Sequence, residues 1–209
     1  MTTQTTKSKT NTDPYDLSNI INQSETNNDN SSEENKDTLI ICPELEDKLS
    51  KCTIKDIPEF SLNGIKTIGK IVDVYDGDTC KIILAQTNKV LMRFNCRLKF
   101  IDTPEMKPLK TKPNRDMEIA NAVKCRNKLI QLTTSCEIGI DEKLTKPQIK
   151  KLLNTNKKVI QIQCHEFDKY GRLLVELYHS PLKETVNDIL VKEGFAKSYD
   201  GGTKDVFVY

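Results

Sequence analysis

Residues 67–105 read TIGKIVDVYDGDTCKIILAQTNKVLMRFNCRLKFIDTPE. Apolar and polar residues alternate over 67–74, over 79–84 and again over 90–98. A period of two is typical of strands with one buried face. The Asp-Gly pair between the first two runs favours a hairpin turn, and Pro104 cannot donate to a strand ladder. The stretch therefore predicts three consecutive strands, with the third ending before the proline.

The residues that follow predict two more strands and several helices. Apolar residues recur at helical spacing along one face of 116–132, with an acidic residue in the first turn. In chain order we expect a helix over 116–132, a short helix within 133–156, a strand from Val159, a tight turn at 168–172, a strand over 173–178 and a helix over 185–194 ending at glycine. The sum is about five short strands with helices around them.

The beginning of the chain has a different composition. Residues 1–37 are dominated by Thr, Asn, Ser, Asp and Glu, so they bury too little apolar surface to offset the entropy of ordering the backbone. We predict a disordered tail there, although its few apolar residues leave open a partner-docking turn. Residues 38–66 are interpreted as an extension with a short helix starting near Pro43. Residues 67–209 form the predicted folded domain, and 133–156 is interpreted as an insertion within it.

Charge is distributed unevenly along the chain. The totals of 32 Lys and Arg and 30 Asp and Glu give a net charge of only +2. Residues 1–50 carry 4 lysines against 10 acidic residues, which leaves 28 basic against 20 acidic residues in the remainder, a net of +8. The predicted folded domain is therefore basic, whereas the tail is not, and a basic surface attracts polyanions.

Other features exclude several classes of protein. The seven cysteines form no CxxC pair, which argues against a structural zinc site. The N-terminus has no apolar core of a secretory signal, and no run approaches the roughly 18 apolar residues that span a bilayer. We expect a monomeric intracellular protein with reduced thiols and no membrane association. The sequence does not indicate its compartment.

Two carboxylates are expected where loops meet water. Asp78 follows the predicted hairpin tip, and Asp102 follows the third strand. Two such carboxylates and a backbone carbonyl can hold a hard cation such as Ca²⁺. The alternative for Asp78 is structural, because Asp in an Asp-Gly turn often bonds its own backbone.

Basic residues near these carboxylates suggest phosphate chemistry. Arg97 precedes Asp102 by five positions, which places the two on opposite faces of a regular strand unless the strand end re-aims one of them. Phosphodiester cleavage needs a metal, a base and forked donors for phosphate, and Glu105 and Arg172 complete that set. A surface ion pair is the alternative for the arginine and the glutamate. Beside Arg172, Lys169 and Tyr170 could grip phosphate and stack on a base, or form an ordinary hairpin with a solvated lysine.

Together these residues resemble the staphylococcal nuclease, or thermonuclease-like, family. The matching blocks stand in the family's order and cover about residues 67–200: VYDGDT at 74–79, RLKFIDTPE at 97–105, DKYGR at 168–172 and VNDILVKEGFAK at 186–197. Four ordered blocks are far more specific than one motif. The resemblance implies an OB-fold, a five-stranded β-barrel with helices of the α+β class.

The resemblance also implies roles for particular residues. Ca²⁺ would be held by Asp78, Asp102 and the carbonyl of Thr103, with Asp76 as a supporting carboxylate. Glu105 takes the position of the family's glutamate, long assigned as general base, and Arg97 and Arg172 take those of its phosphate-binding arginines. Lys169, Tyr170 and, within one residue, Tyr199 correspond to nucleotide-contacting positions.

The implied activity is Ca²⁺-dependent hydrolysis of DNA or RNA, preferably single-stranded, at the P–O5′ bond to leave 3′-phosphates. A different class of function is an OB-fold module without catalysis that binds nucleic acid or partner proteins. Such modules usually lose the arginines or the glutamate, and this sequence keeps all of them.

Overall fold

The computed structural model describes residues 42–85, 90–179, 184–202 and 207. The predicted tail at 1–37 lies outside these residues. The chain divides into two compact units, 1–60 and 61–209. In the first unit, helix α2 (Pro43–Lys51) starts at a proline and has acidic residues in its first turn, as the sequence predicts, and none of its residues is buried.

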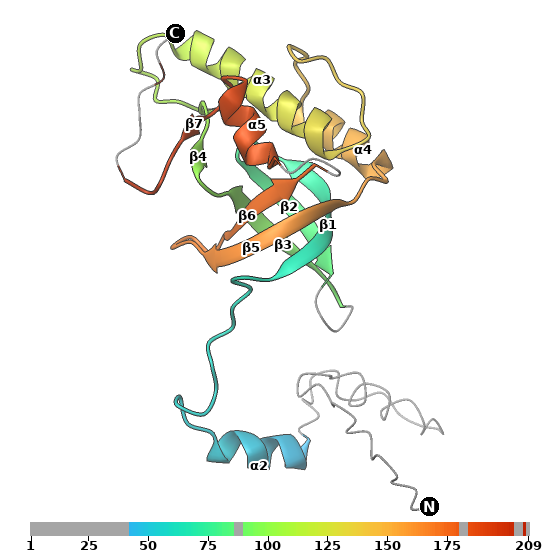
Figure 1. Ribbon diagram of the computed structural model, residues 1–209, viewed down its shortest axis with the longest axis vertical. Coiled ribbons are helices and arrows are strands. Elements are labelled where there is room, and N and C mark those ends of the chain that lie inside the picture. Colours follow the sequence, from blue (N-terminus) through green and yellow to red (C-terminus); the bar gives the residue numbers. More distant parts are fainter. Residues whose placement is uncertain (1–41, 86–89, 180–183, 203–206, 208–209) are drawn as a thin grey trace, which may run out of the picture. The chain divides into compact units, whose positions relative to one another are not determined.

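The second unit contains a closed five-stranded barrel, which confirms the predicted fold class (Figure 1). Around the barrel the strands follow the order β1-β2-β3-β6-β5, and β5 pairs with β1 to close it. All neighbouring pairs are antiparallel except β3 with β6, which is parallel. The strands are β1 (Lys66–Val74), β2 (Thr79–Ala85), β3 (Leu91–Leu98), β5 (Ile160–Phe167) and β6 (Leu173–Tyr178).

A short second sheet follows the third barrel strand. Phe100 has a left-handed backbone with φ of 66°, which is unusual for a residue with a side chain. The chain bends there into β4 (Ile101–Asp102), and β4 pairs with β7 (Lys197–Ser198) near the end of the described chain. Sequence periodicity predicts neither short strand, because two residues carry no readable alternation.

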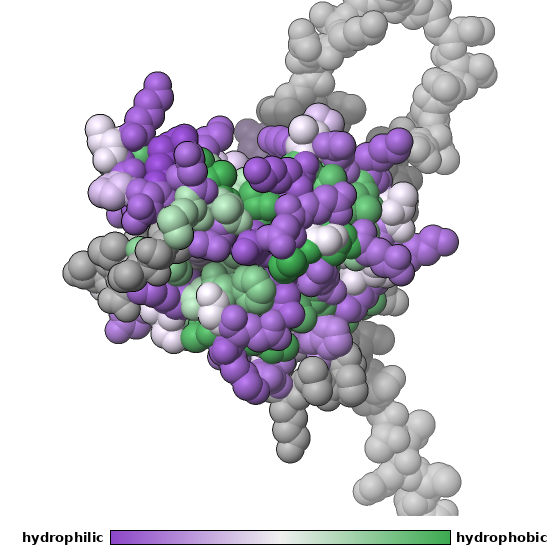
Figure 2. Space-filling model, turned by 90° about the horizontal axis from the view of Figure 1, so that it is seen from above, coloured by the Kyte–Doolittle hydropathy of each residue, from purple (hydrophilic) through white to green (hydrophobic). Residues whose placement is uncertain are grey.

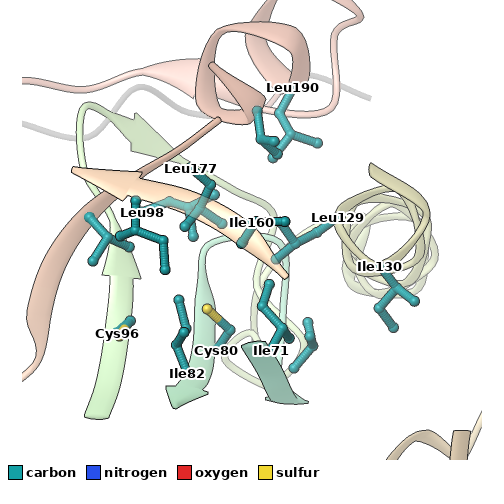
Figure 3. Packing of buried hydrophobic residues seen from close by; sticks show 14 of the residues in the cluster. Ile71, Cys80, Ile82, Cys96, Leu98, Leu129, Ile130, Ile160, Leu177 and Leu190 are labelled. Carbon is teal, nitrogen blue, oxygen red and sulfur yellow. The ribbon is translucent and has the colours of Figure 1, made fainter. Parts of the chain in front are cut away.

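Three helices gather over one end of the barrel (Figure 1). They are α3 (Arg115–Thr133), α4 (Lys146–Thr155) and α5 (Val186–Lys192). The predicted helix within 133–156 corresponds to α4, while its interpretation as an insertion stays a prediction. Leu129 of α3 and Leu190 of α5 point toward the barrel interior and belong to one apolar cluster with the strand residues (Figure 3). The helices therefore complete the core at this end of the barrel.

The face shown in Figure 2 is mostly hydrophilic, with apolar side chains in small separate groups. Among the residues that the structure describes, no helix combines the length and apolar character needed to cross a bilayer. All seven cysteines are free thiols.

Candidate functional site

The candidate site begins at the turn between β1 and β2. The hairpin is confirmed, since the Tyr75 N–H donates to the Thr79 carbonyl at 2.9 Å. The sequence did not reveal why a glycine stands at position 77 of this turn. Gly77 has no positive φ, but an added Cβ would lie 2.0 Å from Cys125 Sγ and 3.0 Å from Thr103 Cγ2. The turn is pressed against α3 and the segment after β4, where no side chain larger than hydrogen fits.

This packing buries a carboxylate just before β2. Asp78 is 2% exposed, and its Oδ1 accepts a hydrogen bond from Thr79 Oγ1 at 2.8 Å. Burial and the neighbouring Asp76 raise the pKa of Asp78 to about 7, although Arg97 acts in the opposite direction. Among the described residues, the Asp78 carboxylate contacts the side chains of Thr79 and Arg97 rather than the backbone of its own turn. It is instead the Asp76 carboxylate that accepts the Asp78 N–H, at 3.2 Å.

Arg97 connects the two candidate metal-binding aspartates. Its guanidinium meets Asp78 through both terminal nitrogens, with Nη1 2.9 Å from Oδ1 and Nη2 2.8 Å from Oδ2. Nη2 also lies 3.1 Å from Asp102 Oδ1. The strand break at Phe100 turns Asp102 back toward Arg97, so the two side chains meet although a regular strand would separate them. Arg97 is thus held by two charged partners in a partly buried position.

The cavity beside this cluster brings several predicted residues together. It has a volume of about 220 Å³. Asp102 does not line the cavity, but it contacts Arg97, which does. Tyr75, which the sequence gave no reason to select, is on the wall near Glu105, and burial together with the carboxylates of Asp76 and Glu105 raises its pKa. The lining residues are Tyr75, Asp76, Asp78, Thr79, Arg97, Thr103, Glu105 and Arg172.

Arg172 approaches the cavity from the turn between β5 and β6. Its Nε lies 2.8 Å and its Nη2 2.7 Å from Asp168 Oδ2. Tyr170 is 72% exposed, with Lys169 Nζ 5.2 Å and Arg172 Cζ 5.5 Å from the centre of its ring. Lys169 and Tyr170 therefore lie outside the cavity wall but adjacent to one of its arginines. The sequence motif includes Asp168, but only the structure identifies it as the partner of Arg172.

Tyr199 does not line the cavity of Arg97, Glu105 and Arg172. Its hydroxyl donates to the Gly202 carbonyl at 3.1 Å, and it lines a separate cavity of about 670 Å³ next to α5. The structure thus does not bring Tyr199 to the cavity of Arg97 and Glu105. His165 does not line that cavity either, and it contacts Glu176 at 2.8 Å and Lys99 at 3.3 Å.

The donor set for a cation is small. Within the described ranges, no group of three or more His, Cys, Asp or Glu side chains is arranged to hold a metal ion. The expected ligands are two carboxylates, from Asp78 and Asp102, and the Thr103 carbonyl. These two aspartates and Asp76 are all buried, while Arg97 contributes one positive charge to them. An excess of buried carboxylate charge with oxygen donors fits a hard cation such as Ca²⁺.

The comparison with family models agrees with this fold. Residues 95–206 match the family described as staphylococcal nuclease homologue, which is more than half of the 209 residues. The match includes Arg97, Glu105 and Arg172, while Asp78 precedes it. No curated protein matches the chain significantly. The chain belongs to the staphylococcal nuclease homologue family, a nuclease-type family.

Proposed function

We propose that this protein is a Ca²⁺-dependent nuclease that hydrolyses DNA or RNA, with a preference for single strands, at the P–O5′ bond to leave 3′-phosphates. One observation carries the proposal: Arg97, Arg172 and Glu105 line the same cavity as Asp78 and Thr103. Two forked cations and a carboxylate around one small cavity match the needs of phosphodiester hydrolysis. None of these side chains alone would support it.

The arginines are suited to bind the phosphate. A guanidinium offers parallel N–H donors that match two phosphate oxygens at once. Arg97 is held against Asp78 and Asp102, so its planar fork has a defined direction before substrate arrives. Donors placed in advance are worth most where negative charge develops, on the oxygens of the phosphorus under attack. We assign Arg97 and Arg172 to this stabilisation.

Glu105 is suited to act as the base. Its side chain is exposed and follows Pro104 in the segment between β4 and α3, so it can reach a water molecule within the cavity. In that role Glu105 accepts a proton from the water that attacks phosphorus in line with the leaving 5′ oxygen. The P–O5′ bond breaks as the new P–O bond forms, and the departing 5′ oxygen takes a proton from solvent. A Ca²⁺ ion held by Asp78, Asp102 and the Thr103 carbonyl would polarise a phosphoryl oxygen.

The exposed turn beside the cavity supports a single-stranded substrate. The ring of Tyr170 is largely exposed and flanked by Lys169 and Arg172. A base that is free of a duplex can stack on such a ring while the neighbouring cations meet the backbone. Because nucleic acid binding through this turn does not require catalysis, a silent OB-fold module would also bind there.

The test is cleavage of labelled single-stranded DNA, single-stranded RNA and duplex DNA by the purified protein. Each substrate is incubated with Ca²⁺, with Mg²⁺ and with a chelator that removes Ca²⁺. We expect cleavage with Ca²⁺, much less with Mg²⁺ because it demands stricter octahedral geometry, and 3′-phosphate ends in the products. Full activity in excess chelator would contradict the metal dependence.

The Glu105→Gln variant separates catalyst from binder. The amide keeps nearly the same shape but cannot take a proton from water, so single-turnover cleavage should fall by more than about tenfold. Affinity for a short single-stranded oligonucleotide should stay within about threefold of the parent, since a base contributes mainly in the transition state. Binding without cleavage by the parent itself would instead favour the silent module.

A further inference from the structure

A buried carboxylate behind the cavity contacts the backbone of Glu105. Glu118 lies in the first turn of α3 and is 1% exposed. Its Oε1 accepts the Glu105 N–H at 3.2 Å, and its Oε2 forms an ion pair with Lys112 Nζ. Both partners belong to the irregular segment between β4 and α3. One side chain therefore fastens this segment at two points, near its beginning and near its end.

The burial of Glu118 makes these contacts necessary. A carboxylate removed from water is strongly destabilising unless it is paired and hydrogen-bonded. Glu105 and Lys112 supply those interactions. A further contact lies between them, where Arg115 Nε donates to the Pro108 carbonyl at 3.4 Å. The segment has no strand or helix of its own between 103 and 114, so its course depends on such contacts with α3.

We propose that Glu118 is a positioning residue for Glu105: it holds the Glu105 backbone so that the carboxylate of Glu105 reaches the cavity shared with Arg97 and Arg172. This inference rests on the proposed function. A glutamate side chain has several rotatable bonds, so its reach is defined only when its backbone is fixed. Displacement of a reacting group by about 1 Å can cost on the order of a hundredfold in rate.

The first measurement is single-turnover cleavage by Glu118→Ala, with Asp116→Ala as the matched control. Asp116 lies in the same turn of α3 but is fully exposed. We expect Glu118→Ala to lower kcat by about tenfold or more while KM changes less than about threefold, because substrate contacts remain. Asp116→Ala should cleave like the parent. Glu118→Gln keeps an oxygen acceptor for the Glu105 N–H, so it should recover most of the lost rate.

A double-mutant cycle with Glu105→Gln distinguishes positioning from a general structural effect. If Glu118 acts through Glu105, Glu118→Ala should change the residual rate of Glu105→Gln by less than about twofold, since residues that act as a unit are not additive. An equal loss of rate in both backgrounds would overturn the proposal. So would parent-like cleavage by Glu118→Ala.

Two further measurements cover the remaining outcomes. If Glu118→Ala does not fold, the double variant Glu118→Gln with Lys112→Met serves in its place, because it removes the ion pair without leaving a buried and unpaired carboxylate. It should lower kcat about threefold or more, again without effect in the Glu105→Gln background. Hydrogen exchange at the Glu105 amide measures its hydrogen bond to Glu118 directly and does not depend on cleavage. Exchange should be faster in Glu118→Ala, which removes the acceptor, than in Glu118→Gln, which keeps it. If the parent does not cleave at all, the proposed function fails, and unchanged exchange at Glu105 in Glu118→Ala would overturn the anchor as well.

Discussion

The two hairpins that border the cavity use glycine for different physical reasons. In the β1–β2 turn, Gly77 has an ordinary backbone but no space for a side chain, because Cys125 lies against it. In the β5–β6 turn, Gly171 has φ of 74°, and a Cβ there would meet nothing within 4 Å. The first turn is limited by packing and the second by backbone conformation. The first is therefore a fixed, buried part of the site, and the second an exposed one.

The arginines next to these turns differ in the same way. Arg97 bridges Asp78 and Asp102, both buried, the first from the turn before β2 and the second from β4. Arg172 is paired with Asp168 of its own turn and lies beside an exposed tyrosine. We infer that the fork of Arg97 is oriented by the core of the domain, whereas that of Arg172 is oriented locally. Substitutions at the first turn should accordingly have larger effects than those at the second.

The largest expected effect is that of Arg97→Lys. Lysine keeps the charge but cannot meet both oxygens of Asp78, Asp102 and a phosphate with one ammonium group. We expect kcat to fall by about a hundredfold, on the order of 3 kcal/mol, as for loss of one donor that stabilises a transition state. The measurement is single-turnover cleavage, with urea unfolding to exclude loss of fold. Arg93→Lys is the control, since Arg93 is exposed on the same strand, and an equal loss in both variants would contradict the assignment.

The second largest effect is expected for Gly77→Ala. The added methyl group meets Cys125 Sγ at 2.0 Å, and overpacking of this kind typically costs about 1–3 kcal/mol. The midpoint of urea unfolding should fall, and cleavage should fall as well because Asp78 shifts with the turn. Replacing Cys125 with alanine in the same chain removes the sulfur. The double variant should therefore be more stable than the sum of the single changes predicts. Strict additivity would show that the contact with Cys125 is not the cause.

The strands and helices were largely predictable because they depend on local periodicity. Alternation identified the strands of the barrel, and the helices α3 and α5 lie within a residue or two of the predicted ranges. The break at Phe100 was not predictable, since nothing in the sequence marks a bulky residue for a left-handed backbone. That break decides the site, because it turns Asp102 toward Arg97.

For the candidate site, the sequence suggested which residues to consider more than how they are arranged. The ordered motifs suggested Arg97, Glu105 and Arg172, and the structure places all three at one cavity. The sequence did not reveal that each arginine is already paired with an aspartate, because such contacts join residues that fold together from different strands or turns. Glu118 looked like an ordinary acidic residue in a first helical turn. Its burial and its bond to Glu105 depend on the course of the segment before it.

Arg172→Lys should have a smaller effect than Arg97→Lys. The turn itself should persist, because Asp168 Oδ1 also accepts the backbone N–H groups of residues 170 and 172 at 2.9 Å. Loss of the planar fork should lower kcat by about tenfold or somewhat more, with little change in unfolding. The same single-turnover assay measures it, beside Arg93→Lys. A loss greater than that of Arg97→Lys would reverse the inferred order of the two arginines.

The smallest expected effect concerns Gly171, and it tests the difference between the two turns directly. Alanine at a left-handed position costs about 1 kcal/mol, and no clash adds to this because the space is open. Asparagine tolerates that backbone better than alanine, so Gly171→Asn should be the more stable of the two variants at this turn. At Gly77 the order should be opposite, because there the backbone is ordinary and only volume matters, so the larger asparagine is worse than alanine. Urea unfolding of the four variants measures both orders. If asparagine and alanine rank the same way at both glycines, one physical cause operates at both turns, and the distinction between a packed turn and a strained turn is wrong.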